Sequence, residues 1–272
     1  MDILYSTIAG IIQGLTEFLP VSSSGHLVFF HYFFGFDFIN DLSFDAVLHL
    51  GTLAALGLFF FSDIFKYLAA FFQSFIRWNI KSDVNQRLAW YLFLATIPAL
   101  LVGYFFESQI ETVFRSPALV AWVFIIFGVI LYLADKYLLT NRSMNQLTLS
   151  NSLIIGLAQA LALIPGVSRS GITIVAGLTQ NLKREQAARF SFLLAIPAVF
   201  AAGAKKMLDL YQLQAFSYSN SLILLVGFLA SAVVGYLCIK YFLKFLENHS
   251  LKVFAYYRIV VGVIVLVVLF FS

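Results

Sequence analysis

The sequence predicts an all-α polytopic membrane protein, with six transmembrane helices and two re-entrant helical hairpins arranged as an inverted-topology repeat. Three observations predict this fold: the composition, the spacing of long apolar segments, and a polar motif that occurs twice. Of the 272 residues, 61% are hydrophobic and 11% are charged, and the mean hydropathy is +0.93. Soluble domains usually carry about 25% charged residues. The bilayer is therefore the expected solvent, and 1–272 is predicted to form a single integral-membrane domain.

Six segments are long and apolar enough to cross a membrane as helices. A helix needs about 20 mostly apolar residues to span the hydrocarbon core. The segments that meet this length are 44–62, 88–106, 118–138, 186–204, 220–238 and 254–271.

Two further apolar stretches, 3–34 and 152–180, are interrupted at their centres by Pro, Ser and Gly. Proline removes a backbone donor and glycine permits turns, so a continuous helix is unfavourable there. Each half is too short to span. We expect two re-entrant hairpins, each made of two short helices, because irregular backbone at membrane depth must be satisfied by protein or by a watery cavity.

The two interrupted stretches share a motif. Each contains Gly-x-x-Gln, a central proline and Ser-x-Ser-Gly, and the identities fall at one constant spacing without a gap, which indicates an internal duplication. The predicted repeats are about 1–140 and 150–272. The matched residues are Gly10 and Gly156, Gln13 and Gln159, Leu15 and Leu161, Val21 and Val167, Ser22 and Ser168, Ser24 and Ser170, and Gly25 and Gly171.

Lysine and arginine orient the spans, because these residues are in excess in cytoplasmic loops. Four loops hold most of them: 63–87, 139–151, 181–189 and 239–253. The basic residues are Lys66, Arg77, Lys81, Arg87, Arg142, Lys183, Arg184, Arg189, Lys240, Lys244 and Lys252. With these loops in the cytoplasm, the six spans thread consistently and both termini lie outside.

The opposite side is predicted to hold the loop 107–117, with Glu107 and Glu111 as surface charges. Lys205 and Lys206 also fall on this outer side and violate the charge rule. Each repeat has three spans, an odd number, so the second repeat is inverted relative to the first. The two hairpin tips can then meet near the midplane, where inverted-repeat transporters place their substrate sites.

Glu17 is the first candidate for chemistry, because a charge at membrane depth costs at least about 2.5 kcal/mol and is usually functional. The alternative is a structural ion pair or a protonated carboxyl. Gln13 lies one helical turn before Glu17 and therefore on the same face. Gln13 and Gln159 could equally be polar contacts between membrane helices.

The two serine-rich turns, Ser22 to Gly25 and Ser168 to Gly171, are each expected to open a second short helix. A helix N-terminus offers unpaired N–H groups and favours an anion. Arg169 adds a planar donor suited to phosphate. Plain N-capping by serine is the alternative for any one of these serines. Thr173 could add a donor or bond back to its own helix.

Three further polar residues are open in role. His26 could be a general base, a proton donor, a ligand or a structural residue. Asp45 and His49 form an i, i+4 pair at the start of a span, where a capping role at the wetter membrane edge competes with a supporting role in the site. The lone Cys238 excludes an intramolecular disulfide, and no nucleotide-binding loop or nucleic-acid module is found.

Gln13-x-x-x-Glu17 followed by Pro20-Val-Ser-Ser-Ser-Gly-His26, together with Pro165-Gly-Val-Ser-Arg-Ser-Gly-Ile-Thr173, resembles the bacterial undecaprenyl-pyrophosphate phosphatase family, which is also linked to bacitracin resistance. The resemblance covers the whole chain. It implies a plasma-membrane enzyme, with its site facing the outer side, that removes one phosphate from undecaprenyl pyrophosphate. The product is the lipid carrier for peptidoglycan. The implied site residues are Gln13, Glu17, Ser22, Ser23, His26, Ser168, Arg169, Ser170 and Thr173.

This resemblance has one departure: many members have Glu where this chain has Gln13. Glu17 is therefore expected to be the essential carboxylate. The expected roles are catalysis for Glu17, Ser23, His26 and Arg169, and substrate binding for the other motif residues.

Phosphoryl transfer depends mainly on positioning and on charge neutralisation. Glu17 and Gln13 are expected to hold a divalent cation, Mg²⁺ or Ca²⁺, on the phosphates. The nucleophile is either Ser23 activated by His26, which the resemblance favours, or a water.

A competing interpretation is a polyprenyl-phosphate transporter or flippase, because inverted repeats are typical of transporters. The concentration of Arg, Ser, His and Glu in the two tips is richer than lipid binding requires. Polyprenyl pyrophosphate and membrane lipids are the expected partners, and a homodimer is an arrangement that the sequence allows.

Overall fold

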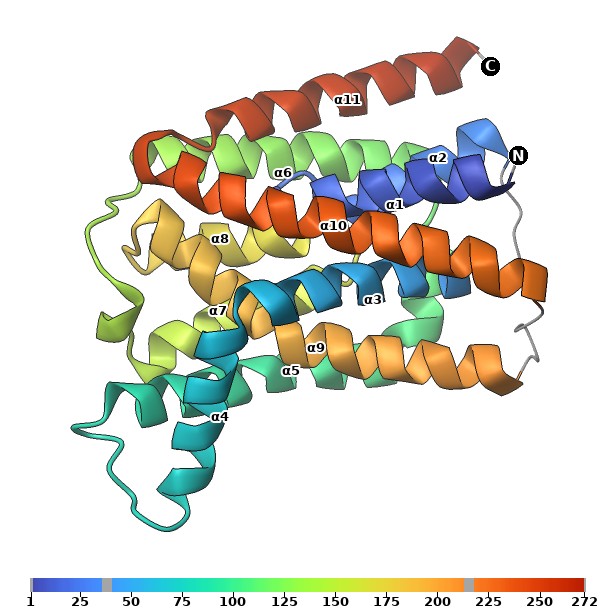
Figure 1. Cartoon of the computed structure of the whole chain (residues 1–272). Coiled ribbons are helices and arrows are strands. Elements are labelled where there is room, and N and C mark those ends of the chain that lie inside the picture. The colour runs from blue at the N-terminus through green and yellow to red at the C-terminus, as the bar shows by residue number, and fades with distance from the viewer. Residues whose placement is uncertain (1, 36–40, 213–217, 272) are drawn as a thin grey trace.

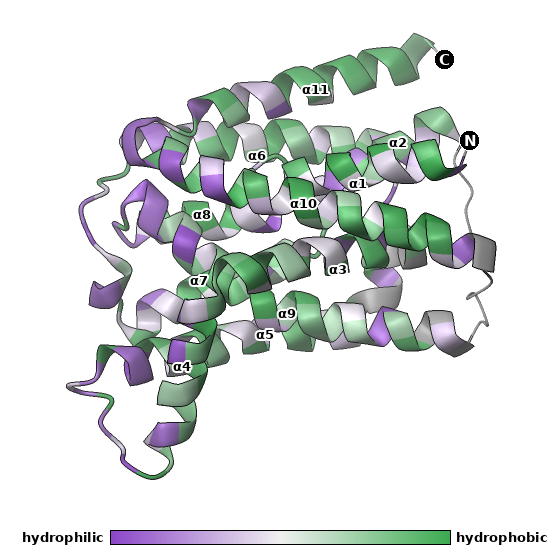
Figure 2. Ribbon diagram, viewed as in Figure 1, coloured by the Kyte–Doolittle hydropathy of each residue, from purple (hydrophilic) through white to green (hydrophobic). Residues whose placement is uncertain are grey.

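The computed structural model describes residues 2–35, 41–212 and 218–271. Over these ranges the chain folds into eleven α-helices and one short 3-10 helix, η1 (Met144–Gln146) (Figure 1). The all-α prediction is confirmed. Figure 2 shows that hydrophobic residues dominate the long helices, whereas hydrophilic residues gather at the connections drawn on the left.

Five helices are long and apolar enough to cross a membrane: α5 (Val84–Val113), α6 (Pro117–Tyr137), α9 (Arg184–Gln212), α10 (Tyr218–Asn248) and α11 (Lys252–Phe271). A sixth crossing is supplied by α3 (Asp41–Phe59) and α4 (Phe61–Ser74), if this pair counts as one span. The pair bends by 80° at Phe60, whose backbone leaves the helical conformation. By length and composition, five or six spans therefore agree with the six predicted.

The predicted loops are partly wrong. Helix α10 continues to Asn248, through most of 239–253, and α9 already begins at Arg184, within 181–189. The segment 63–87 is helical as far as Ser74, because it buries Tyr67 and Ala70 at helical spacing and Asp63 pairs with Arg189 at 2.5 Å. The segment 107–117 is helical as far as Val113, and α6 follows with Pro117 in its first turn, where proline is tolerated. The side chains of Glu107 and Glu111 lie outside the described part of the structure.

Each interrupted stretch forms two helices joined by a turn: α1 (Asp2–Phe18) with α2 (Ser23–Phe34), and α7 (Leu149–Leu161) with α8 (Arg169–Thr179). In Figure 1 the outer ends of α1 and α2 point to the side with both chain termini, and those of α7 and α8 point to the opposite side. The turns of both pairs lie inside the bundle.

The first helix of each pair packs against a long helix of the other half, α1 on α10 and α7 on α5. Glycine makes both crossings close. A Cβ on Gly10 would lie 2.5 Å from the Gly227 carbonyl oxygen, and one on Gly156 would lie 2.2 Å from that of Ala95. Gly10 and Gly156 are matched positions of the predicted repeat, and this packing brings the two turns together.

Candidate active site

The two turns end in the same unusual conformation. Ser22 has φ 72° and ψ 96°, and Ser168 has φ 75° and ψ 110°. Non-glycine residues with positive φ are uncommon, and such backbone costs about 1–3 kcal/mol. Each serine caps the following helix, because its hydroxyl accepts from the N–H three residues on, Gly25 at 3.3 Å and Gly171 at 3.1 Å. The two serine-rich turns thus each open a short helix, as expected, and these helices begin at Ser23 and Arg169.

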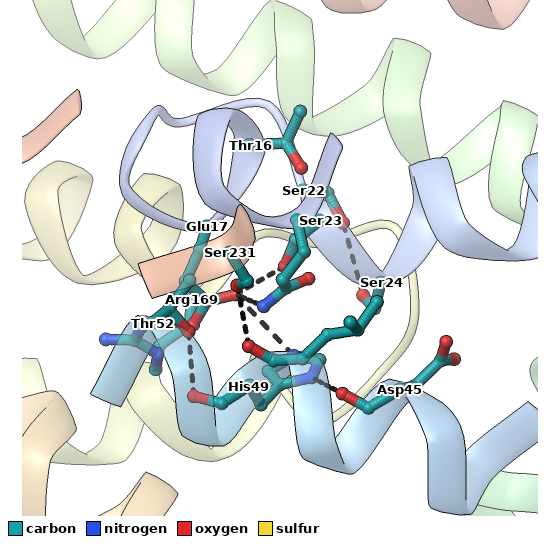
Figure 3. A network of polar contacts seen from close by, with 12 residues as sticks. Thr16, Glu17, Ser22, Ser23, Ser24, Asp45, His49, Thr52, Arg169 and Ser231 are labelled. Carbon is teal, nitrogen blue, oxygen red and sulfur yellow. Dashed lines mark hydrogen bonds and ion pairs between the residues drawn. The ribbon is translucent and has the colours of Figure 1, made fainter. Parts of the chain in front are cut away.

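Glu17, at the end of α1, joins the two turns (Figure 3). Its Oε1 accepts from Arg169 Nη2 at 2.6 Å, and its Oε2 accepts from Ser23 Oγ at 2.5 Å and from Gln13 Nε2 at 3.0 Å. Glu17 as a whole residue is 7% exposed. Charge-assisted hydrogen bonds of this length are the strong ones, so the hydroxyl of Ser23 is held on a base and Arg169 is fixed beside it.

Two buried atoms beside Glu17 have no hydrogen-bond partner among the described residues: Arg169 Nη1 and Gln13 Oε1. Buried polar groups are normally satisfied, and exceptions need an explanation. Arg169 can therefore hold Glu17 with one nitrogen and a phosphate oxygen with the other.

A cavity of about 700 Å³ reaches this cluster. Glu17, Ser23 and Arg169 line it, together with the two capping serines, and its walls are otherwise mostly apolar. The apolar lining comes mainly from α5, α9 and the turn that follows α7, and it includes Ala99, Leu100, Tyr104, Ile110, Leu163 and Val199. Arg115, Lys205 and Lys206 also line it. The two lysines that violated the charge rule thus line the cavity of the site.

His26 is not beside Ser23, contrary to the expected pair. Its Nδ1 donates to the Ser22 carbonyl oxygen at 2.7 Å, and its Nε2 lies 2.8 Å from the Tyr257 hydroxyl. The ring also stacks on Tyr257 at 5.7 Å. His26 is one turn after Ser23 on α2, but it faces α11, so the base in contact with Ser23 is Glu17.

Ser170 and Thr173 are buried away from the cavity, contrary to the expected substrate contacts. Ser170 donates to the Leu19 carbonyl oxygen at 2.9 Å and so ties the second turn to the first. Thr173 bonds back to the Arg169 carbonyl oxygen at 2.6 Å and lies 2.6 Å from the Ser191 hydroxyl. Both residues brace the site in this geometry.

His49 is the imidazole that lies near the carboxylate. Its Nδ1 donates to the Asp45 carbonyl oxygen at 2.7 Å, which leaves Nε2 facing Glu17 Oε2 at 3.5 Å. The Asp45 carboxylate contacts His31 Nε2 at 2.9 Å and Arg115 Nη2 at 3.4 Å. The sequence predicts either a capping or a supporting role for Asp45 and His49. Their i, i+4 spacing places them on one helix face but does not show which residues face them.

Arg258 was missed by the sequence reasoning, although an arginine inside a predicted span is itself a signal. It is 1% exposed and donates to backbone carbonyls of both turns. Nη1 reaches Pro20 at 3.2 Å and Val167 at 3.0 Å, and Nη2 reaches Gly166 at 2.7 Å. One buried guanidinium therefore donates to carbonyl oxygens that have no helical N–H partner where the helices are interrupted.

We expect Arg258→Met to destabilise the protein by roughly 3 kcal/mol, because buried carbonyls without a donor cost about 1–3 kcal/mol each. Thermal unfolding in detergent measures this, with Lys240→Met as the control, since Lys240 is an exposed cation on α10. A melting temperature equal to that of the control would contradict a bracing role for Arg258.

The donor set near Glu17 fits a hard divalent cation. Mg²⁺ is usually held by one or two carboxylates together with substrate phosphates, and amide oxygens are further ligands for such ions. Glu17 and the unpartnered Gln13 Oε1 supply one of each. Among the described residues there is no group of three or more His, Cys, Asp or Glu side chains that could hold a metal. A cation here would therefore depend on the substrate for its other ligands.

Known proteins match this sequence over nearly the whole chain. The family model described as "Bacitracin resistance protein BacA" matches residues 6–264. A protein of Rubrobacter xylanophilus named undecaprenyl-diphosphatase is 44% identical over 266 residues, which cover 97% of each chain. A protein with the same name from Methanobrevibacter smithii is 45% identical over 273 residues, again 97% of each chain.

A third relative, from Geotalea daltonii, carries this name too and is 43% identical over 273 residues, which cover both chains completely. The family model and these relatives therefore match the chain over nearly its whole length. The chain therefore belongs to the family of the bacitracin resistance protein BacA.

Proposed function

We propose that this protein is a membrane phosphatase that hydrolyses undecaprenyl diphosphate to undecaprenyl phosphate and inorganic phosphate. It would thereby recycle the lipid carrier for peptidoglycan and other envelope polymers. The observation that carries the proposal is the contact of Ser23 and Arg169 with Glu17 in the wall of a largely apolar cavity. The names of the relatives agree with it.

In the proposed first step, Ser23 Oγ attacks the terminal phosphorus of the diphosphate and its proton passes to Glu17 Oε2. The bond from that phosphorus to the bridging oxygen breaks, and undecaprenyl phosphate leaves with the electron pair. Glu17 passes this proton to the leaving undecaprenyl phosphate and is a carboxylate again. Water then attacks the phosphoserine and gives a proton to Glu17, the bond from phosphorus to Ser23 Oγ breaks, Ser23 Oγ takes the proton back from Glu17, and inorganic phosphate is released. Arg169 Nη1 neutralises the phosphoryl oxygens throughout, the role that dominates such reactions.

A divalent cation, Mg²⁺ or Ca²⁺, is part of the proposal, with Glu17 and Gln13 Oε1 as the residues that hold it. When bound, it would neutralise charge on the phosphate oxygens. Ser22 and Ser168 keep the two helix N-termini directed at the cavity, and these offer N–H groups to an anion.

The proposed setting is the plasma membrane, with both helix pairs re-entrant and the site open to the outer face. Two observations support this orientation. The cavity is lined by Tyr104, Ile110 and Arg115, which lie toward the α5–α6 connection, whereas the lysine- and arginine-rich connections lie at the opposite side. The opposite directions of the two pairs are those that an inverted repeat requires. The polyprenyl tail would lie along the apolar walls of the cavity.

Phosphate release from a C15 or C55 polyprenyl diphosphate, by purified protein in detergent, tests the proposal. We expect release that falls strongly in EDTA and returns with MgCl2 or CaCl2, since the site supplies too few ligands to retain a cation without substrate. Phosphate release that persists in EDTA would contradict the role of the cation and leave the rest of the phosphatase proposal standing. If folded wild-type protein releases no phosphate, the phosphatase is excluded, and the flippase, which no relative supports, would be tested next.

A further inference from the structure

Gln159, on α7, is the most conspicuous unsatisfied side chain of the site. It is 2% exposed and lines the cavity that holds Glu17 and Arg169. Neither its Nε2 nor its Oε1 has a hydrogen-bond partner among the described residues. Its amide is therefore buried against a cavity and bonded to no described group on either side.

The predicted repeat explains how this amide became unpaired. Gln13 and Gln159 are matched positions, and the partner of Gln13 one turn later is Glu17, at 3.0 Å. The residue one turn after Gln159 is Leu163, which cannot accept a hydrogen bond. The second copy thus keeps the amide without its carboxylate, and Leu163 lines the same cavity.

Keeping such an amide is unfavourable unless a ligand satisfies it. Leaving a buried donor or acceptor unsatisfied forfeits its hydration without a replacement, whereas an apolar side chain of similar volume would carry no such penalty. Polar residues between membrane helices usually bond across the helix interface, but Gln159 has no such described partner. The remaining compensation is a ligand in the cavity.

We propose that Gln159 is a substrate-binding residue, whose Nε2 donates to an oxygen of the same diphosphate that Arg169 Nη1 binds. Both donors are buried, both lack a described partner, and both residues line one cavity. A diphosphate group has enough acceptor oxygens for the two together. Gln159 Oε1 then accepts from a water or hydroxyl that enters beside the substrate. This inference rests on the proposed phosphatase function and adds a residue from α7 to it.

The variant Gln159→Met tests the proposal, because methionine conserves the volume and removes the amide. We expect its melting temperature without ligand to equal or exceed that of the wild type. We expect a higher KM for the C15 diphosphate. We also expect affinity for its unhydrolysable methylene-bridged analogue to fall about 10- to 100-fold, the usual effect of losing a hydrogen bond to a charged group.

Gln86 is a matched control, since it is also 2% exposed but fully bonded. Its Oε1 accepts from Asn79 N at 2.9 Å and its Nε2 donates to the Arg77 carbonyl oxygen at 3.1 Å. Because Gln86→Met breaks these two bonds, it should lower the melting temperature and leave the affinity for the analogue unchanged. If Gln159→Met behaves like Gln86→Met, Gln159 is structural and the inference fails.

The analogue separates this failure from failure of the proposed function. If the wild type hydrolyses the diphosphate and Gln159→Met binds the analogue as tightly as the wild type does, only the inference about Gln159 is overturned. Wild-type protein that neither hydrolyses the diphosphate nor binds the analogue would overturn the phosphatase proposal and the inference with it.

Discussion

Ser23→Ala should reduce phosphate release by on the order of 10⁴-fold or more, because it removes the proposed nucleophile. Ser23 is the first residue of α2, its hydroxyl lies 2.5 Å from Glu17 Oε2, and it is 7% exposed beside the cavity. No other hydroxyl group is hydrogen-bonded to Glu17 in the described part of the chain. The measurement is steady-state phosphate release, together with trapping of a phosphoenzyme from substrate labelled in the terminal phosphate.

Ser24→Ala is the matched control, since Ser24 also lines the cavity but contacts the Ser22 hydroxyl, at 3.3 Å. We expect less than about a tenfold loss there, the effect of one neutral hydrogen bond. A loss of only 10- to 100-fold in Ser23→Ala, with no label on the wild-type protein, would indicate a water nucleophile oriented by Glu17.

Part of this site could be predicted because the cost of polar groups in a membrane marks them in the sequence. Glu17, Ser23 and Arg169 lie in apolar stretches, and the structure brings all three together. The serine-rich order around Ser23 and Arg169 also predicts that a short helix follows each turn. The contacts of Gln13 and Ser23 with Glu17 span only four and six residues of chain, so the short-range pattern was sufficient for them. The contact of Arg169 spans 152 residues, and the predicted meeting of the two hairpin tips was needed to bring it near.

The remainder depended on tertiary contacts that no local pattern encodes. His26 and His49 both sit four residues after a polar residue, yet only the ring of His49 faces Glu17, because α3 packs against α1 while His26 faces α11. Arg258 reaches two turns that are about 90 and 240 positions away in the chain. Helix rotation about its own axis decides such contacts, and the sequence of a nearly uniformly apolar helix leaves that rotation open.

Glu17→Gln should lower phosphate release by about 10²- to 10⁴-fold, the contribution expected of a positioned general base. Glutamine keeps the shape of the side chain but cannot take the proton of Ser23. It also leaves the Arg169 guanidinium without its anion, and breaking a buried pair costs about 3–5 kcal/mol. The melting temperature should therefore fall as well. Asp135→Asn serves as the control, because Asp135 is also a buried carboxylate paired with an arginine, Arg184 at 2.5 Å, but does not line the cavity. It should lower the melting temperature without a comparable loss of turnover.

Loss of stability alone could lower activity, so the decisive measurement is binding of the methylene-bridged C15 diphosphate to Glu17→Gln. In the wild type, Arg169 Nη2 is held by Glu17 Oε1 at 2.6 Å and only Nη1 is unpartnered. Without the carboxylate both nitrogens can turn to the phosphates, in the bidentate geometry that guanidinium favours. In EDTA, where the cation that Glu17 is proposed to hold does not contribute, the analogue should then bind the variant at least as tightly as the wild type and raise its melting temperature, although turnover with MgCl2 is lost. Weaker binding in EDTA together with lost turnover would instead mean that Glu17 holds the substrate without a cation and that the proton of Ser23 goes elsewhere.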